Sequence, residues 1–203
     1  MKKYFQSSLV LFILFDVALL FGQTSQSSYS ETLLSDNTTV HHVSRPAMIF
    51  TPIQNQVAGL IGFTSGLYLN NSFYVGLSGY ANLTHSKVNS GMLGVEIENT
   101  INPENLVHFG YSLFAGIGFV KDYQQKNGLL DDFLNIFGTQ FYFAQPSVLL
   151  EINFDSFTRI AIGAGYRFVA GLNEMNKDIS ISKLQNRDLN NLTFFINLKT
   201  IYF

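Results

Sequence analysis

The stretch TRIAIGAGYRFVAG, residues 158–171, sorts its side chains into two sets by position. One set is apolar and mostly large, namely Ile160, Ile162, Ala164, Tyr166 and Phe168. The other set combines small residues with cations, namely Arg159, Ala161, Gly163, Gly165 and Arg167. Successive side chains of a β-strand point to opposite faces, so the two sets would face opposite sides of a sheet. In a soluble sandwich the glycines would occupy the buried face and contribute little to packing. A narrow membrane barrel would instead turn the apolar set to lipid and the other set inward. The stretch therefore favours a membrane barrel.

The composition agrees with a protein that needs little charged surface. The chain has 203 residues, of which 47% are hydrophobic and only 13% are charged, whereas soluble domains have about 25% charged residues. This length suits one domain with attached tails. The formal net charge of -2 argues against the basic stripe that a nucleic-acid partner requires. The absence of cysteine excludes disulfides, thiolate chemistry and a lipid-modified cysteine anchor.

The N-terminal segment has the parts of a secretory signal peptide. Lys2 and Lys3 precede an apolar run from Leu9 to Phe21, which a polar stretch follows, and this order is typical of an export signal. We expect residues 1–22 to be the signal peptide, cleaved after Gly22, with an uncleaved anchor as the alternative. Residues 23–44 are rich in serine and threonine and predict a flexible leader. The barrel domain would then span residues 45–203.

From there the chain alternates between apolar and polar residues in short steps, and no sustained helical period occurs. The strands that this pattern predicts are residues 45–53, 57–69, 73–83, 92–101, 106–120, 140–154, 158–172 and 189–203. They number about eight, an even number as closed single-chain bacterial barrels require, with short connections alternating with longer ones. The sequence thus predicts an all-β, antiparallel, up-and-down transmembrane barrel. Pro146 cannot donate to a strand ladder, so we expect a local irregularity there.

Charged residues on the polar face of the predicted strands form the most specific pattern. The predicted interior network consists of Glu96, Glu98, Glu151, Arg159, Arg167 and Lys199. Three acids and three bases can neutralise one another, and we expect Glu151 and Arg159 to make a diagonal contact across a short turn. The interior of an eight-stranded barrel is just wide enough for side chains to fill. We therefore expect a salt-bridged plug, with a conducting path as the alternative.

Other candidate sites carry weaker patterns, and we expect no catalytic, cofactor or metal site. His108 and Ser112 both face inward, but they stand too far apart on one strand for a nucleophile and its base. His41 and His42 in the predicted leader lack further ligands at metal-binding spacing, so we interpret them as solvated residues. The short glycine motifs do not form a nucleotide-binding fingerprint.

Three segments resemble small outer-membrane β-barrel proteins of the OmpA/OmpX-like kind from Gram-negative bacteria. They are GVEIENTINPENLVHFGYSLFAGIG at 94–118, FAQPSVLLEINFDSFTRIAIGAGYRFVAG at 143–171 and RDLNNLTFFINLKTIYF at 187–203. The resemblance implies that the terminal Phe203 serves as the closing aromatic signal for the barrel-assembly machinery. It also implies the lipid bilayer of the outer membrane as the surroundings of the protein.

These patterns predict a structural, anchoring or surface-interaction role without catalysis. An extracellular ligand would bind at the loops 121–139 and 173–188, but we favour the interpretation that these are solvated loops without a specific partner. Two alternatives remain open at this point. One is a small outer-membrane channel or transporter, and the other is a periplasmic lipocalin-like binding barrel.

Overall fold

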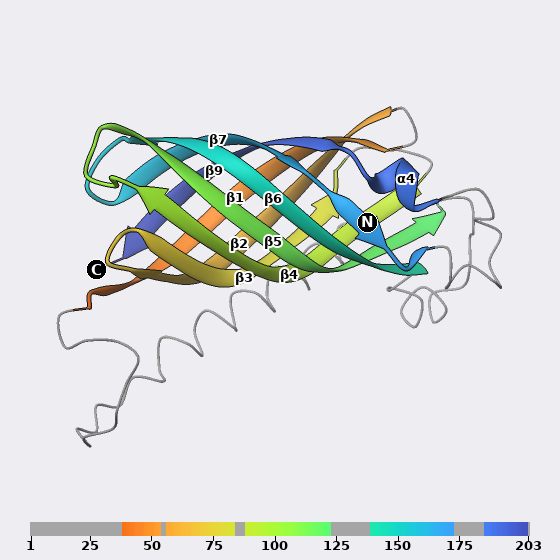
Figure 1. Ribbon diagram of the computed structural model, residues 1–203, viewed down its shortest axis with the longest axis horizontal. Coiled ribbons are helices and arrows are strands. Elements are labelled where there is room, and N and C mark those ends of the chain that lie inside the picture. Colours follow the sequence, from red (N-terminus) through yellow and green to blue (C-terminus); the bar gives the residue numbers. More distant parts are fainter. Residues whose placement is uncertain (1–37, 54–55, 84–87, 123–138, 173–184, 203) are drawn as a thin grey trace, which may run out of the picture. The chain divides into compact units, whose positions relative to one another are not determined.

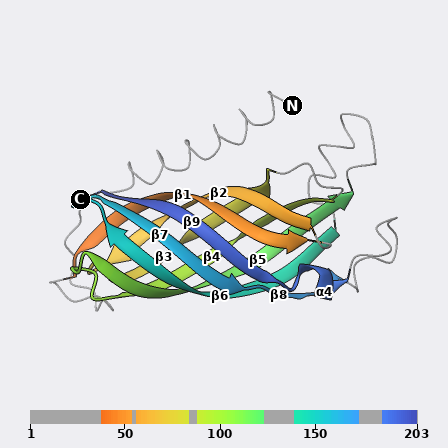
Figure 2. The same cartoon turned by 90° about the horizontal axis from the view of Figure 1, so that it is seen from above.

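The described part of the chain forms a closed antiparallel β-barrel (Figure 1, Figure 2). This computed structural model describes residues 38–53, 56–83, 88–122, 139–172 and 185–202. The barrel belongs to a compact unit that spans Thr39–Phe203. Its elements are β1 (Val40–Ile53), β2 (Gln56–Leu69), β3 (Phe73–Asn82), β4 (Val88–Ile101), β5 (Val107–Asp122), β6 (Thr139–Asn153), β7 (Thr158–Tyr166), β8 (Phe168–Ala170), α4 (Asn186–Leu189) and β9 (Leu192–Tyr202).

Each strand pairs with its neighbours in sequence, and the pairing of β1 with β9 closes the ring. β7 and β8 both pair with β6 and follow one another along the same line. They keep the same register, because Ser147 faces Gly165 and Ala144 faces Phe168. The two pieces therefore count as one interrupted strand, and the barrel has eight strands in up-and-down order. The predicted all-β, antiparallel, up-and-down barrel architecture is confirmed.

The connections differ at the two ends of the barrel. Turns at 70–72, 102–106 and 154–157 lie at one end, which we call the short-turn rim. Asn70, Asn71 and Asn102 have φ angles of 51°, 56° and 53°, and asparagine is among the few residues that adopt this left-handed conformation readily. The opposite end, which we call the long-connection rim, carries α4 (Figure 1). Most of the loops predicted at 121–139 and 173–188 lie outside the described residues.

The two faces of the wall differ in the way that the opening stretch predicted. Arg159 and Arg167 are buried, whereas Ile160, Ile162 and Phe168 are exposed. Outward-facing side chains on the other strands repeat the pattern and include Phe50, Ile61, Leu67, Leu77, Leu93, Val95, Ile97, Leu113, Ile117, Val148, Phe194 and Ile196. The outer wall is thus an apolar belt, and polar groups lie inside.

Three predicted strand starts were wrong by three residues or more. β4 begins at Val88 instead of residue 92. β1 begins at Val40, so the end of the predicted leader belongs to the barrel, and it pairs with β2 from the first residue, Val40 opposite Leu69. The last strand begins at Leu192 instead of residue 189. The residues before it form α4, where Asp188 and Gln185 make reciprocal capping contacts and Leu189 is buried. The alternation of apolar residues did not distinguish this short helix from the start of a strand.

The irregularity expected at Pro146 occurs in the ladder between β6 and the strand formed by β7 and β8, whereas pairing with β5 continues through Pro146, which stands opposite Leu113. β6 pairs with β7 from Ser147 onward and with β8 up to Ala144, so the ladder is interrupted between these residues. Proline has no N–H to donate there. On the opposite side of the same strand, the N–H of Arg167 donates to the backbone oxygen of Asn191 at 2.9 Å, which continues the register of the β7–β9 ladder.

Paired glycines let neighbouring strands approach closely. Gly94 of β4 faces Gly116 of β5. A Cβ atom on Gly94 would collide with the backbone carbonyl of Ala115, and backbone atoms cannot turn aside as a side chain can. The position therefore requires glycine.

We predict that Gly94→Ala strongly reduces the yield of folded barrel, because the added methyl group meets backbone. Gly91→Ala on the same strand is the matched control, since its Cβ would lie 3.3 Å from the backbone oxygen of Tyr80 and meet no other atom within van der Waals range. The measurement is the fraction of protein that migrates as the folded form on an unheated gel after refolding in detergent. Equal folded fractions for the two variants would contradict this explanation.

Candidate functional site

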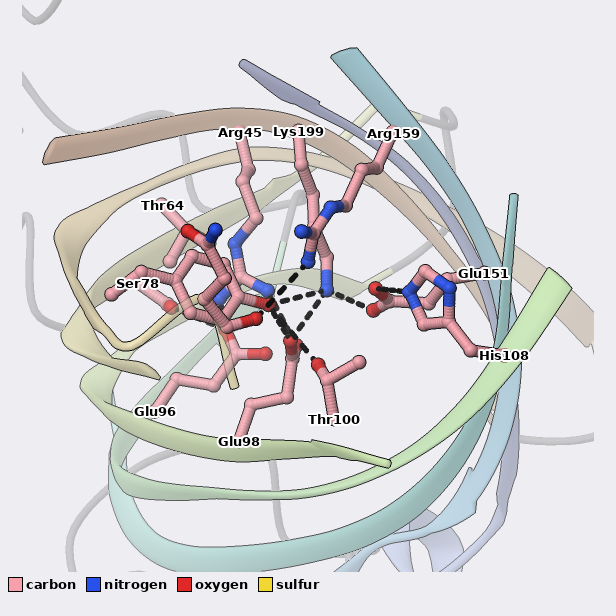
Figure 3. A network of polar contacts seen from close by, with 12 residues as sticks. Arg45, Thr64, Ser78, Glu96, Glu98, Thr100, His108, Glu151, Arg159 and Lys199 are labelled. Carbon is pink, nitrogen blue, oxygen red and sulfur yellow. Dashed lines mark hydrogen bonds and ion pairs between the residues drawn. The ribbon is translucent and has the colours of Figure 1, made fainter. Parts of the chain in front are cut away.

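The interior near the short-turn rim holds a continuous network of buried charged groups (Figure 3). We call it the charge network, and its members are Arg45, Tyr68, Glu96, Glu98, His108, Glu151 and Lys199. They come from β1, β2, β4, β5, β6 and β9. Residues far apart in sequence therefore meet because the closed sheet turns one face of every strand toward the same axis.

Glu98 is the centre of the charge network. Its carboxylate accepts a hydrogen bond from Arg45 at 2.7 Å and further bonds from Tyr68 and Lys199. Glu98 and Lys199 are 1% and 0% exposed. A buried ion is costly unless it is paired and hydrogen-bonded, so these contacts are what permits charge at this depth.

The charge network extends from Glu98 in two directions. Toward the middle of the barrel, Arg45 also contacts Glu96 at 3.2 Å, and Ser78 donates to Glu96 at 2.7 Å. Toward the rim, Lys199 contacts Glu151. Figure 3 shows the cations Arg45 and Lys199 approaching from one side and the carboxylates of Glu96 and Glu98 from the opposite side.

His108 joins the charge network at its rim end. Its Nδ1 lies 3.0 Å from the backbone oxygen of Asn105, and its Nε2 lies 3.0 Å from Glu151. A carbonyl oxygen only accepts, so Nδ1 carries a hydrogen and donates. The contact between Nε2 and Glu151 then needs a second proton, held by the imidazole or by the carboxyl group. His108 thus has a hydrogen-bonding role with Glu151, and Ser112 faces Glu98 across β4 and β5.

All six residues of the predicted interior network are buried, but the structure brings together only four of them. Glu96, Glu98, Glu151 and Lys199 join the charge network. The predicted contact between Glu151 and Arg159 was wrong. Glu151 instead contacts Lys199 and His108, while Arg159 donates to the backbone oxygen of Asn71 at 3.3 Å and lies over the ring of Tyr68.

Arg167 stands apart from the charge network. It is 2% exposed, and its Nε donates to Gln145 at 3.2 Å. Its Nη2 has no hydrogen-bond partner, and Arg167 contacts no carboxylate in the part of the chain that the structure describes. The predicted balance of three acids and three bases did not include Arg45, which pairs with two of the acids.

A second layer fills the interior toward the long-connection rim. We call it the aromatic layer, and it consists of Tyr80, Phe114, Phe141 and Phe143. The rings of Phe114 and Phe143 pack edge to face with their centroids 4.7 Å apart, a favoured arrangement for aromatic pairs. Leu172 and Leu189 pack into the same cluster and are buried. Between the two layers, a small cavity of about 10 Å³ lies beside Glu96, Gln145 and Asn197, which is room for about one water molecule.

Comparison with known proteins finds similarity among solved structures. No protein-family model matches the chain, and no curated protein matches it. Among solved structures, it is similar to the crystal structure of Neisserial surface protein A (NspA), with a TM-score of 0.51 and 10% sequence identity. The match covers 82% of this chain and 99% of NspA. At this identity the likeness concerns the fold, which it supports over nearly the whole of NspA.

Sequence reasoning missed two parts of the interior. Arg45 was the first residue of the predicted strand 45–53 and shares the inward face of Ala47 and Ile49, but it was not included in the predicted interior network. The aromatic layer was also missed, because the alternation places its rings on the inward face but does not indicate that they contact one another.

His41 and His42 were interpreted as solvated, but both are half-buried residues of β1, and His42 lies 3.1 Å from Ser65. Within the described ranges, no group of three histidine or acidic residues could hold a metal ion.

We predict that Lys199→Met lowers the free energy of unfolding by about 3–5 kcal/mol, because it leaves Glu98 and Glu151 buried without their shared cation. The neighbouring Leu198 faces outward, so Leu198→Met is the matched control, with an expected cost below about 1.5 kcal/mol. The measurement is urea-induced unfolding of the refolded protein in lipid vesicles. A loss in Lys199→Met no larger than that of the control would show that the charge network contributes little to stability.

Proposed function

We propose that the protein is an outer-membrane β-barrel with a structural, anchoring or surface-interaction role and an interior closed by the charge network. One observation carries this proposal: the wall is apolar outside and charged inside, the reverse of a soluble protein. Residues in the middle of strands, such as Val95, Ile97 and Ile162, are more than 40% exposed, while Glu98, Glu151 and Lys199 are nearly inaccessible. A hydrocarbon environment explains both facts, because it solvates apolar side chains and excludes unpaired charge.

The ends of the wall support the same proposal. Large apolar side chains gather at the short-turn rim, where Phe154, Phe157, Leu106 and Phe109 are all at least half exposed. Aromatic girdles of this kind mark the membrane interfaces of outer-membrane barrels.

Among the residues that the structure describes, no helix has both the length and the apolarity to cross a membrane. NspA, which has a similar fold, is named a surface protein, and we extend a surface location to this chain as part of the proposal.

The closed interior favours an anchor over a pore. The charge network and the aromatic layer occupy the barrel one above the other, so ions would have to displace both.

We propose no catalytic role and no cofactor. The partners of this proposal are the lipid bilayer, the barrel-assembly machinery through Phe203, and an extracellular ligand at the loops. Phe203 and most of those loops lie outside the described residues, and the OmpA/OmpX-like assignment stays a prediction.

The two alternatives fare differently. A lipocalin-like binder would enclose its large apolar side chains around a ligand, but Leu93, Val95 and Ile97 face outward. A small channel or transporter fits the wall equally well and differs only in the interior. Its supporting feature is Arg167, a buried cation outside the charge network.

We predict that the full-length chain, expressed in a Gram-negative host, is recovered in the outer-membrane fraction and migrates differently on a gel with and without boiling. Val95→Arg, in the middle of the belt, should cost about 2–4 kcal/mol of stability in lipid, whereas Leu106→Arg at the rim should cost about 0–1 kcal/mol. Both side chains are exposed, so a soluble protein would tolerate both changes. Recovery as a soluble periplasmic protein without a heat-dependent shift would overturn the membrane proposal.

The closed interior predicts that the purified barrel gives no conductance steps in a planar lipid bilayer. The channel alternative predicts discrete steps whose size or ion selectivity changes in Arg159→Gln or Arg167→Gln. Protein verified as folded by gel mobility is used for all three samples. Steps that respond to either substitution would replace the anchor with the channel.

A further inference from the structure

A row of hydroxyl groups crosses the outer wall near the short-turn rim. Ser44 of β1 stands opposite Ser65 of β2 on one side and opposite Thr200 of β9 on the other. Thr200 in turn stands opposite Thr158 of β7. We call these four residues the hydroxyl row. They lie side by side on four neighbouring strands, although they are distant in sequence.

The hydroxyl row faces outward. Ser44 has the same parity as the exposed Pro46, and Thr200 has the same parity as Leu198 and Ile196. Thr158 begins β7 at the rim, whereas Ser65 lies inside β2, so the row runs from the rim into the wall. All four residues are half-buried. Polar groups at this depth in an apolar belt need hydrogen-bonding partners.

His42 adds an imidazole to this surface. Its Nε2 lies 3.1 Å from the hydroxyl of Ser65. His42 is on the outward parity of β1 with Ser44 and Pro46. Asp155 is the acidic group beside the row: its carboxylate accepts hydrogen bonds from the backbone N–H groups of Phe157 and Thr158, each at 2.7 Å, so it lies at the rim end. Away from that end, the hydroxyls of Ser44 and Thr200 and the imidazole of His42 offer donors to a group with several oxygen acceptors.

An apolar groove begins where the hydroxyl row ends. We call it the β1 groove, and the outward side chains that line it are Pro46, Met48, Ile61, Ile160, Ile196 and Leu198. Pro46, Ile160 and Leu198 are each the next outward residue along the strand from a member of the hydroxyl row. The groove has a volume of about 360 Å³, within the range of small-molecule sites. A polar row and an apolar groove thus form one continuous surface.

We propose that this surface binds one phospholipid, with its phosphate on the hydroxyl row and His42 and an acyl chain in the β1 groove. This inference rests on the proposed membrane location and adds a lipid class and a place on the wall to it. A phosphate accepts hydrogen bonds from serine and threonine hydroxyls and from a histidine N–H. The acyl chain buries the apolar groove. A second groove on the wall, lined by Phe109, Val148, Ile162 and Phe194 among others, has a similar volume of about 400 Å³ and no hydroxyl row among its lining residues.

The test is native mass spectrometry of the folded barrel released from detergent, with dimyristoyl phosphatidylglycerol as the probe. We expect one bound phospholipid on the unsubstituted protein. The double variant Ser44→Ala/Thr200→Val should weaken binding about tenfold or more, the effect of losing one hydrogen bond to a charged group. Met48→Trp, which fills the β1 groove, should weaken it similarly, and Ile162→Trp in the second groove should leave it unchanged.

Two further probes separate the parts of the site. Dimyristoylglycerol, which lacks the phosphate, and glycerol phosphate, which lacks the chains, should both bind at least tenfold more weakly than the phospholipid. Equal binding of either probe, or equal retention of phospholipid by all variants, would overturn the proposal. Every variant is first checked for the heat-dependent gel shift and for its cell fraction. A folded outer-membrane barrel without selective lipid binding would therefore refute this inference and leave the proposed function intact.

Discussion

The hydrogen-bonded pairing of β1 with β9 is the constraint on which the rest of the structure depends. It converts a sheet with two free edges into a closed wall, so that each of the eight strands has a neighbouring strand on both sides. Closure also leaves each side chain only two environments, the interior and the outer belt. Because parity along a strand alternates strictly, a one-residue shift of register would send lysine and glutamate to the outside and leucine and valine to the inside. The need to keep the charged residues inside and the need to keep the apolar residues outside therefore both specify the same register.

Closure makes the interior narrow, and the narrow interior explains which residues occupy it. Glycines at positions such as Gly94 and Gly116 leave room for the backbones of neighbouring strands to curve. The larger side chains separate into two layers, with ionic contacts around Glu98 near the short-turn rim and packed rings around Phe114 near the long-connection rim. This separation has a physical reason: buried charged groups are stabilised by ion pairs with opposite charges, and aromatic rings are stabilised by packing against other rings. Arg167 is the exception, a buried cation whose described partner is the side chain of Gln145.

The outer wall has more chemical detail than an anchor alone requires. Most outward positions are apolar, as lipid contact demands, but four hydroxyl residues align across β2, β1, β9 and β7. Their alignment depends on the pairing of the first and last strands, so the proposed phospholipid site would exist only in the closed barrel. A specific lipid at this place would also cover the line where the two ends of the sheet meet. Anchoring and lipid recognition would then depend on the same closure.

The sequence by itself determined the class of fold, the alternation of lipid-facing and interior residues, and most strand positions. These properties are local, because side-chain parity and turn chemistry act within a few residues, as in 158–171 and at Asn70 and Asn71. Only the tertiary structure decided which interior charges meet. Glu151 and Arg159 are near one another in sequence, yet Glu151 pairs with Lys199 and His108, while Arg45 reaches Glu98 across the barrel. The hydroxyl row and the aromatic layer were likewise hidden, because their members are brought together by register and curvature, which no single strand specifies. The start of β1 and the short helix α4 also required the fold, since pairing with a partner strand and burial of Leu189 determine them.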